Sequence, residues 1–504
     1  MRYLLAHDLG TSGNKATLFA ETGELIASSL SVYKTDYFNN NWAEQDPDDW
    51  WLAVCSSSRD LIKKSKIAAA DIASISFSGH MMGCLCLDDK GNPLRRHILW
   101  ADQRAQKQAR QINQKLGPEK FYRITGHRSN ASYGLQKLMW VRDNEPQIYQ
   151  KTQTVVNAKD WVVFKMTGNL LSEYSDACSM TALDLENRQW SDEILAAARI
   201  DKSKLPQLVP STHTAGTLTA KAADETGLIP GIPVVMGGGD GLCATIGAGC
   251  VKEGLVHACI GSSAWVSFAS KKPLFDKEMR TFNWIHIVPG LVCPCGTMQS
   301  AGAAYSWMKD QLAVWEKEQS EKSGKRVYAL IDEIAAESEP GSNGVLFMPY
   351  LIGERSPRWH SDAKGAFIGL KMETKRADLF RSVLEGVAMN LAIIIDVYRE
   401  YGYAIDKINL IGGGAKSDLW CQIMADIWNS QINKLNYLDE ATSMGAAVTG
   451  GVGVGLYKDF DAIETFIKPA KLYLPNDRTS DTYQHARDLF ESLYQALAPV
   501  FTKF

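Results

Sequence analysis

Short apolar runs separated by a glycine-rich turn open the chain and predict a β-meander. Apolar residues dominate positions 3–9, 16–19 and 25–32, and the polar turn Gly10-Thr11-Ser12-Gly13 separates the first two runs. Runs of this length joined by glycine turns are typical of antiparallel strands. We therefore expect a three-stranded meander at the N-terminus.

The middle of the chain repeats this pattern. Apolar runs at 255–260 and 264–268 flank the turn Gly261-Ser262-Ser263, and a helix of small residues is expected just before them, at 242–249. Two hairpins with polar, glycine-rich turns, each opening about half of the chain, predict two similarly built α/β domains that face one another across a cleft. We place the domains at residues 1–245 and 246–504.

The remaining pattern alternates strands and helices. Strands are expected at 72–78 and 84–87, and helices between 102 and 150, at 379–401 and at 483–501. The stretch 407–428 reads as a strand, the turn Gly412-Gly413-Gly414-Ala415-Lys416-Ser417 and a helix. A strand, a glycine turn and a helix in this order are typical of nucleotide-handling proteins.

Composition and charge narrow the range of partners. The chain has 504 residues, enough for two hydrophobic cores, and 45% of them are hydrophobic. Its net charge of -3 comes from 54 basic and 57 acidic residues spread along the chain, so we expect neither nucleic acid nor a membrane as partner. A small molecule is the expected partner.

Cysteine usage and the N-terminal sequence predict a cytoplasmic protein. The ten cysteines include no CxxC pair, and the nearest couples, Cys84 with Cys86 and Cys293 with Cys295, read as buried strand residues. The apolar run after Arg2 is broken by His7 and Asp8, too early for the core of a signal peptide.

Both glycine turns are candidates for phosphate binding, because successive backbone N–H groups donate to phosphate oxygens where no bulky side chain intervenes. A single such turn is more often only structural, whereas two on opposing domains favour a nucleotide site. Neither turn matches the G-x-x-x-x-G-K-[ST] phosphate loop or the dinucleotide pattern G-x-G-x-x-G.

Two aspartates stand beside these turns. Asp8 ends the first apolar run, where it could hold Mg²⁺ through water molecules or could cap the turn. Asp240 follows Gly237-Gly238-Gly239, which leave its carboxylate unobstructed, and precedes a helix. It could be a helix cap or the general base that accepts a proton from an attacking hydroxyl.

Taken in order and spacing, these motifs resemble the FGGY carbohydrate kinase family over essentially the whole chain, and within it xylulose kinases most. The resemblance rests on 8–13 (DLGTSG), 78–83 (SGHMMG), 100–104 (WADQR), 136–141 (QKLMWV), 175–177 (SDA), 239–241 (GDG), 261–263 (GSS), 353–357 (GERSP), 365–370 (GAFIGL), 385–386 (EG) and 412–417 (GGGAKS).

The resemblance implies two actin-like (ribonuclease H-like) ATPase domains, an ATP- and Mg²⁺-dependent kinase of small sugars, and a homodimer. It implies that Asp240 is the base and that Asp8, with Asp240, serves the metal ion. The sugar pocket would be lined by His80, Met81, Trp100 and Asp102, together with Asp240. ATP would be bound by Gly10, Thr11, Ser12, Gly261, Ser262, Ser263, Gly413, Gly414 and Ala415.

One departure bears on the substrate. Xylulose kinases generally read Ser-Gly-Gln-Met-His-Gly where this chain has His80-Met81-Met82 in the middle, so Met82 replaces a pocket histidine and a histidine stands two places earlier. A shift of two residues on an extended segment returns a side chain to the same face. A ketopentose such as D-xylulose is the first expectation, with a hexulose, an aldonate such as gluconate, a polyol or glycerol as alternatives.

Two rivals lie outside the enzyme class. A non-catalytic, actin-like nucleotide switch would keep the fold without turning over a sugar, and the free carboxylate expected at Asp240 argues against it. A glycine-rich α/β fold without a nucleotide role would make every paired motif accidental.

Overall fold

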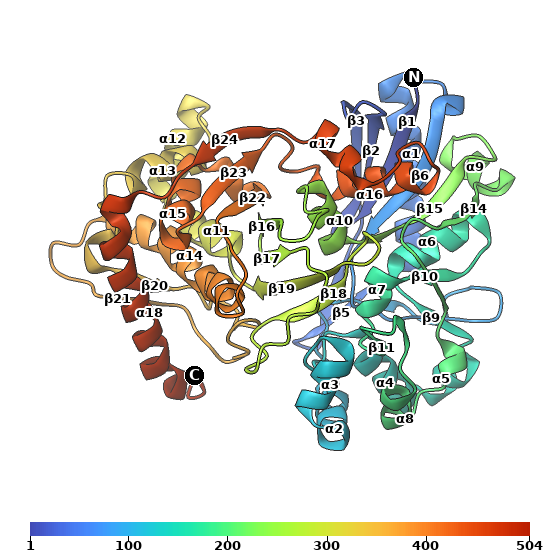
Figure 1. The fold of residues 1–504 in the computed structure, drawn as a ribbon, viewed down its shortest axis with the longest axis horizontal. Helices are drawn as coiled ribbons and strands as arrows, with labels where there is room; N and C mark the ends of the chain where they lie inside the picture. The colour runs from blue at the N-terminus through green and yellow to red at the C-terminus, as the bar shows by residue number, and fades with distance from the viewer.

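The computed structural model describes every residue from Met1 to Phe504. It forms two α/β domains, each built on its own sheet (Figure 1). This confirms the predicted two-domain architecture.

The sheet of the N-terminal domain has the strand order β14-β15-β6-β1-β2-β3. The meander β1–β2–β3 is antiparallel, and β6 and β15 extend it from β1 in parallel. The strands are β1 (Tyr3–Leu9), β2 (Gly13–Ala20), β3 (Leu25–Val32), β6 (Ile72–Gly79), β14 (Thr214–Thr217) and β15 (Pro233–Gly239). Because β1, β6 and β15 run in parallel, their carboxyl ends meet at one edge of the sheet.

The C-terminal sheet repeats this arrangement in the order β18-β19-β17-β16-β22-β23-β24. An antiparallel meander, β16–β17–β19, is again extended by two parallel strands, β22 and β23. The strands are β16 (Val256–Ile260), β17 (Ala264–Phe268), β18 (Phe282–Ile285), β19 (Val292–Met298), β22 (Lys407–Ile411), β23 (Gln431–Leu435) and β24 (Pro469–Tyr473). Both predicted hairpins are therefore confirmed.

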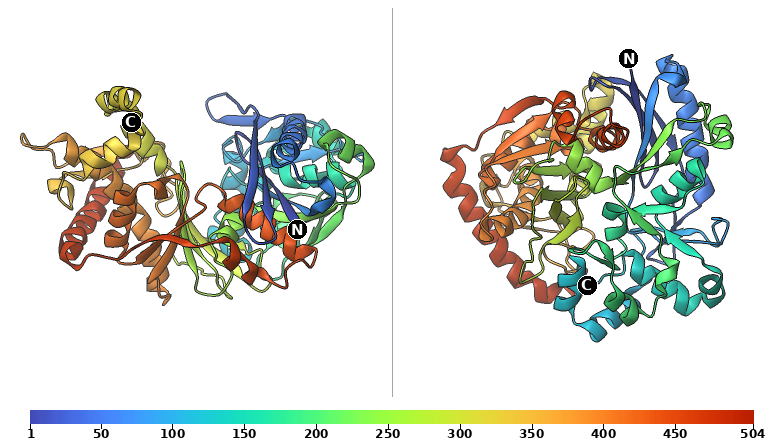
Figure 2. Two further views of the ribbon diagram at one scale, coloured as in Figure 1. Left: turned by 90° about the horizontal axis from the view of Figure 1, so that it is seen from above. Right: turned by 45° about the vertical axis from the view of Figure 1, so that its right-hand side comes forward.

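A late segment of the chain returns to the N-terminal domain. Helices α16 (Ala441–Gly453) and α17 (Ile463–Phe466) lie on that lobe, where α16 packs against α10 (Asp240–Gly247) and the sheet (Figures 1 and 2). Helices α10 and α16 pack very closely. A Cβ at Gly247 would lie 1.8 Å from the carbonyl oxygen of Ala441, and a Cβ at Gly445 would lie 1.9 Å from the carbonyl oxygen of Cys243. Only glycine permits this approach.

Each lobe has its own core. The largest apolar cluster surrounds the buried helix α14 (Arg376–Glu400) of the C-terminal domain, and a second occupies one face of the N-terminal sheet. A third covers the other face of that sheet and continues onto β18 and β19, so it also joins the two lobes. All ten cysteines are buried and unpaired, as expected for Cys84, Cys86, Cys293 and Cys295.

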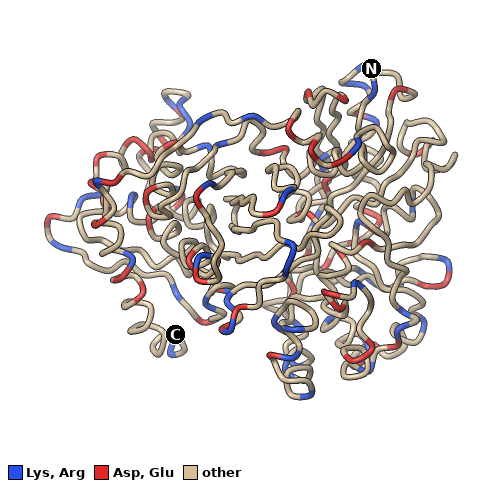
Figure 3. The backbone as a smooth tube through the Cα atoms, viewed as in Figure 1, with Lys and Arg blue, Asp and Glu red and all other residues tan.

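Basic and acidic residues are interspersed over both lobes (Figure 3). None of the helices combines the length and apolar character that crossing a membrane requires. The boundary placed near residue 245 stays a prediction.

Candidate active site

Asp240 is the first residue of α10 and directly follows the end of β15. Its Oδ1 accepts the N–H of Gly241 at 2.7 Å, and the carboxylate has no cationic partner. Burial raises the pKa of Asp240 to about 7, and the negative charge of Asp8 adds to this shift. A carboxylate that titrates near neutral pH is suited to accept a proton from a hydroxyl.

The glycines before Asp240 have a second purpose that the sequence did not reveal. A Cβ at Gly237, where φ is +70°, would lie 1.8 Å from the carbonyl oxygen of Phe77, and one at Gly239 would lie 2.4 Å from the Sδ of Met81. These positions let β15 lie against β6 and the Met81 side chain. The glycines therefore determine the position of Asp240 relative to β6, where the chain leaves the sheet.

Asp8 lies near the end of β1, opposite Ser78 of β6. Ser78 Oγ donates to Asp8 Oδ1 at 3.0 Å, and Lys15 is its cross-strand neighbour on β2. Burial raises the pKa of Asp8, while Lys15 and the Ser78 hydroxyl lower it. Asp8 and Asp240 thus flank β6 at the edge where the parallel strands end.

The first predicted phosphate turn, Gly10-Thr11-Ser12, joins β1 to β2 beside these aspartates. Its carbonyls are held by side chains: Tyr33 Oη donates to the oxygen of Gly10 at 2.5 Å, and Gln45 Nε2 donates to that of Thr11 at 2.7 Å. Trp100 Nε1 donates to Thr11 Oγ1 at 3.0 Å. A residue predicted to line the sugar pocket therefore contacts the turn predicted to bind phosphate.

His80 and Met81 follow β6 and are buried. The ring of His80 lies 5.4 Å from that of His97 and 5.6 Å from that of Trp50, and no nitrogen of either histidine has a hydrogen-bond partner. Burial lowers the pKa of His80 to about 4, so the ring is neutral at physiological pH. Buried polar atoms without partners are unusual and are available to a bound hydroxyl.

Asp102 uses both carboxylate oxygens within the protein. Its oxygens accept Arg104 Nε and a terminal guanidinium nitrogen of Arg104 at 2.7 to 3.0 Å, and Oδ2 accepts the N–H of Ala43 at 2.7 Å. The side chain is fully buried. Its sugar-binding role stays a prediction, and its observed contacts fix the segment that carries Trp100.

Lys137 belongs to the QKLMWV segment at 136–141, and the structure gives it a definite place. Its fully buried ammonium donates to the carbonyl oxygens of Met82 and Leu99, each at 2.7 Å, and of Ser132 at 2.5 Å. Burial lowers the pKa of Lys137 to about 7. One side chain is therefore hydrogen-bonded to three segments around the predicted sugar pocket. The spacing of residues in the sequence does not predict this contact.

The second half of the predicted ATP site gathers where β16 and β22 end. Gly261 to Ser263 form the turn after β16, and Gly413, Gly414 and Ala415 lie in a short 3₁₀ helix after β22. A Cβ at Gly414 would lie 2.4 Å from Cγ2 of Ile260, next to Gly261. The turn also accepts the N–H of Gly302 at 2.9 Å, a neighbour that the sequence analysis did not single out.

Asp439 connects the two halves of this site. Lys15 Nζ, from the N-terminal sheet, donates to the carbonyl oxygen of Asp439 at 2.5 Å. Lys416 Nζ, at the end of the 3₁₀ helix, lies 2.6 Å from Asp439 Oδ2. The strand beside Asp8 and the segment predicted to line adenosine thus meet at one residue.

A buried polar network holds the backbone next to Asp240. Ser175 Oγ accepts the N–H of Gly239 at 3.0 Å and donates to Glu173 Oε1 at 2.8 Å. Glu173 also accepts Ser211 Oγ at 2.6 Å and lies 3.7 Å from Lys159 Nζ. The network fixes the last residue of β15, and therefore the start of α10.

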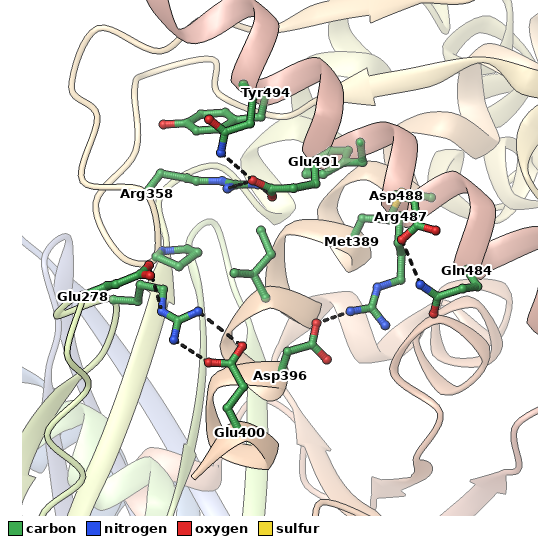
Figure 4. A pocket seen from close by; sticks show the side chains of 15 residues that line it. Glu278, Arg358, Met389, Asp396, Glu400, Gln484, Arg487, Asp488, Glu491 and Tyr494 are labelled. Carbon is green, nitrogen blue, oxygen red and sulfur yellow. Dashed lines mark hydrogen bonds and ion pairs between the residues drawn. The ribbon is translucent and has the colours of Figure 1, made fainter.

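A cavity of about 500 Å³ lies apart from these residues, among α14, α18 (Ser480–Phe501) and the segments around residues 280 and 358 (Figure 4). Each of its arginines is already paired with a carboxylate, as Arg280 with Glu400, Arg358 with Glu491 and Arg487 with Asp396. Because its charges are matched within the protein, this cavity offers no free anion site.

Comparison with known proteins gives one family for both halves. Sequence models described as the FGGY family of carbohydrate kinases match residues 3–247 (N-terminal domain) and 256–454 (C-terminal domain). The chain is similar to a xylulose kinase from Staphylococcus epidermidis, with 34% identity over 495 residues, 98% of this chain and 96% of the relative. It is also similar to a gluconokinase from Bacillus licheniformis, with 30% identity over 506 residues, 99% of this chain and 97% of the relative.

A solved structure supports the same fold. The ligand-bound xylulose kinase from Lactobacillus acidophilus matches with a TM-score of 0.92 and 25% identity, covering 100% of both chains.

Proposed function

Since the chain belongs to the FGGY family of carbohydrate kinases, we propose that this ATP-dependent sugar kinase phosphorylates a ketopentose such as D-xylulose, with Asp240 as the general base. The observation that carries the proposal is a carboxylate without a cationic partner, with a pKa of about 7, at the edge of the sheet beside the predicted phosphate turn. The resemblance to xylulose kinases supports the choice of sugar.

In this proposal Asp240 accepts the proton of the attacking hydroxyl while that oxygen approaches the γ-phosphorus in line with the leaving oxygen of ADP. Backbone N–H groups of the turns at Gly10 to Ser12 and Gly261 to Ser263 hold the phosphates, and Gly413, Gly414 and Ala415 line the adenosine. Closing of the two lobes would exclude water and limit wasteful hydrolysis of ATP.

Asp8 and Asp240 fit a magnesium ion. Burial raises the pKa of both carboxyl groups, and the charge of Asp8 contributes to the shift at Asp240, so the two carboxylates interact at this edge of the sheet. Mg²⁺ binds through one or two carboxylates and keeps several water molecules, so two acidic side chains suffice. When bound with ATP, Mg²⁺ would neutralise charge on the phosphates during transfer.

An aldonate such as gluconate is the second candidate substrate. Met82 stands where xylulose kinases generally have a histidine, and a gluconokinase is similar to this chain over nearly its full length.

The experiment is a measurement of ADP release with ATP and Mg²⁺ over D-xylulose, D-ribulose, D-fructose, D-gluconate, xylitol and glycerol. We expect strong stimulation by D-xylulose. Stimulation by another compound alone would move the substrate within the family. ATP turnover that no compound stimulates would contradict the proposed function and favour a nucleotide switch. The cytoplasmic location and the homodimer remain predictions from the sequence.

A further inference from the structure

We propose that Arg355, from the C-terminal domain, reaches across to the sugar pocket of the N-terminal domain and binds the oxygen-rich end of the substrate, opposite the hydroxyl that is phosphorylated. The inference rests on the proposed function and adds a specificity-determining residue. Arg355 belongs to the GERSP segment at 353–357, to which the sequence analysis assigned no role.

The residues on both sides of Arg355 are anchored in the C-terminal domain. Glu354 accepts the N–H of Gln299 at 2.8 Å and Asn390 Nδ2 at 3.1 Å, and Ser356 Oγ donates to the carbonyl oxygen of Arg280 at 2.7 Å. The chain turns at Ser356 to Arg358, so Arg355 lies at the entry to this turn, between two residues that are fixed to their own domain.

The side chain of Arg355 meets the N-terminal domain. Its guanidinium carbon lies 5.9 Å from the ring centre of Tyr133, and its charge contributes to lowering the pKa of Lys137. Lys137 holds the carbonyl oxygen of Met82, at the turn predicted to line the sugar pocket. Tyr133 directly precedes α4 (Gly134–Asn144), the helix of Lys137, so Arg355 lies at the start of the helix that carries this group.

The guanidinium of Arg355 has no carboxylate partner within the protein. Burial raises the pKa of Tyr133, and a hydrogen bond from Arg355 opposes that rise. Arg355 forms no ion pair, and its buried Nε has no hydrogen-bond acceptor. Arg358, three residues later, shows the usual arrangement, because Glu491 lies 2.7 Å from it. A partly buried arginine that lacks a carboxylate leaves strong donors free, and a planar guanidinium matches a carboxylate or a pair of adjacent oxygens.

The chemistry of the ligand follows from this arrangement. Arg355 places a positive charge beside Tyr133, at the start of the helix whose Lys137 holds the carbonyl oxygen of Met82, whereas Asp240 serves the attacked hydroxyl in the proposed mechanism. The group bound there presents oxygen acceptors at its C1–C2 end: the carbonyl and hydroxyl of a ketose, or the carboxylate of an aldonate.

The test compares R355M and R355K with wild type, using D-xylulose and D-gluconate as probes and measuring the KM of the sugar and of ATP separately. Loss of a charge-assisted hydrogen bond should raise the sugar KM of R355M by about 10- to 100-fold. The KM of ATP should stay within about twofold, which a general loss of structure would not allow. A larger effect with D-gluconate than with D-xylulose would identify a carboxylate as the group bound.

R128M is the matched control, because Arg128 also lies at the boundary of the lobes but donates to the carbonyl oxygens of Met279 and Glu278. Its sugar KM should remain near that of wild type. If R355M fails to fold, R355K, which keeps the charge and loses the planar fork, should still raise the sugar KM severalfold. An active wild type whose Arg355 variants keep its sugar KM would overturn this inference alone; a wild type that phosphorylates no sugar would overturn the proposed function as well.

Discussion

Asp8 and Asp240 lie on either side of strand β6, and the charge of Asp8 helps to hold the pKa of Asp240 near 7. The strand order β15-β6-β1 produces this relationship, because parallel strands bring residues distant in sequence to the same edge. One aspartate is thereby available to serve the metal ion while the other titrates in the range that a general base requires.

The first prediction concerns pH. Burial and the charge of Asp8 raise the pKa of Asp240 to about 7, so the basic form is lost as the pH falls below 7. The kcat/KM for the sugar should therefore rise about tenfold per pH unit below 7 and level off above it. An activity that stays constant between pH 5.5 and 8 would argue against Asp240 as the base.

The raised pKa of Asp240 also predicts that the stability of the protein decreases as the pH rises, whereas its activity increases. Because the native pKa of Asp240 exceeds that of an unfolded chain, ionisation above pH 7 destabilises the native state, and this cost disappears near pH 4. Without nucleotide, D240N should have a higher Tm than wild type at pH 8, and the difference should shrink at pH 5. Calorimetry of both proteins at the two pH values tests the sign.

Replacing Asp8 should affect the metal requirement first. D8N removes one of the two carboxylates proposed to serve Mg²⁺ and should raise the Mg²⁺ concentration for half-maximal activity by about tenfold. S78A removes only the hydroxyl that donates to Asp8 at 3.0 Å and should give a smaller change in the same direction. Equal Mg²⁺ titrations of wild type and D8N would refute the role given to Asp8.

The network behind Asp240 predicts a separation of kcat from KM. S175A leaves the buried N–H of Gly239 without its acceptor, which should displace the start of α10 and lower kcat about tenfold with little change in the sugar KM. S211A is the control, since Ser211 donates to the same Glu173 but does not touch Gly239. If both variants lower kcat equally, the network supports the fold and not the base.

The histidine shift predicts a change of substrate preference. Met82 has a φ of +65°, a region that histidine enters more readily than most residues, so the double variant H80Q/M82H can restore the xylulose kinase pattern. It should raise the ratio of kcat/KM for D-xylulose over D-gluconate by about tenfold or more. An unchanged ratio would show that positions 80 and 82 do not select the sugar.

Local patterns predicted much of the fold. The apolar runs at 25–32, 264–268 and 407–411 coincide with β3, β17 and β22, and the helix expected after the turn at 412–417 is α15 (Asp418–Trp428). These elements combine strong alternation or helical spacing with glycine or serine at their ends, so their boundaries are encoded locally.

Long-range features could not be predicted in this way. The sequence pattern assigns no strand to the glycine-rich stretch before Asp240, but Gly238 and Gly239 belong to β15, because pairing with β6 outweighs their low strand propensity. Likewise, the position of α16 on the N-terminal lobe and the three carbonyl oxygens around Lys137 depend on contacts between distant segments. Periodicity contains no information about such pairings.

The central claim is tested most directly by measuring sugar-stimulated ADP release by wild type and D240N in the same assay, with ATP binding measured for both. We predict that the stimulating sugar raises ADP release by wild type at least tenfold, and that D240N binds ATP nearly as well but loses about 10²- to 10⁴-fold of the stimulated rate. A D240N variant that retains near-normal sugar-dependent turnover would contradict the account.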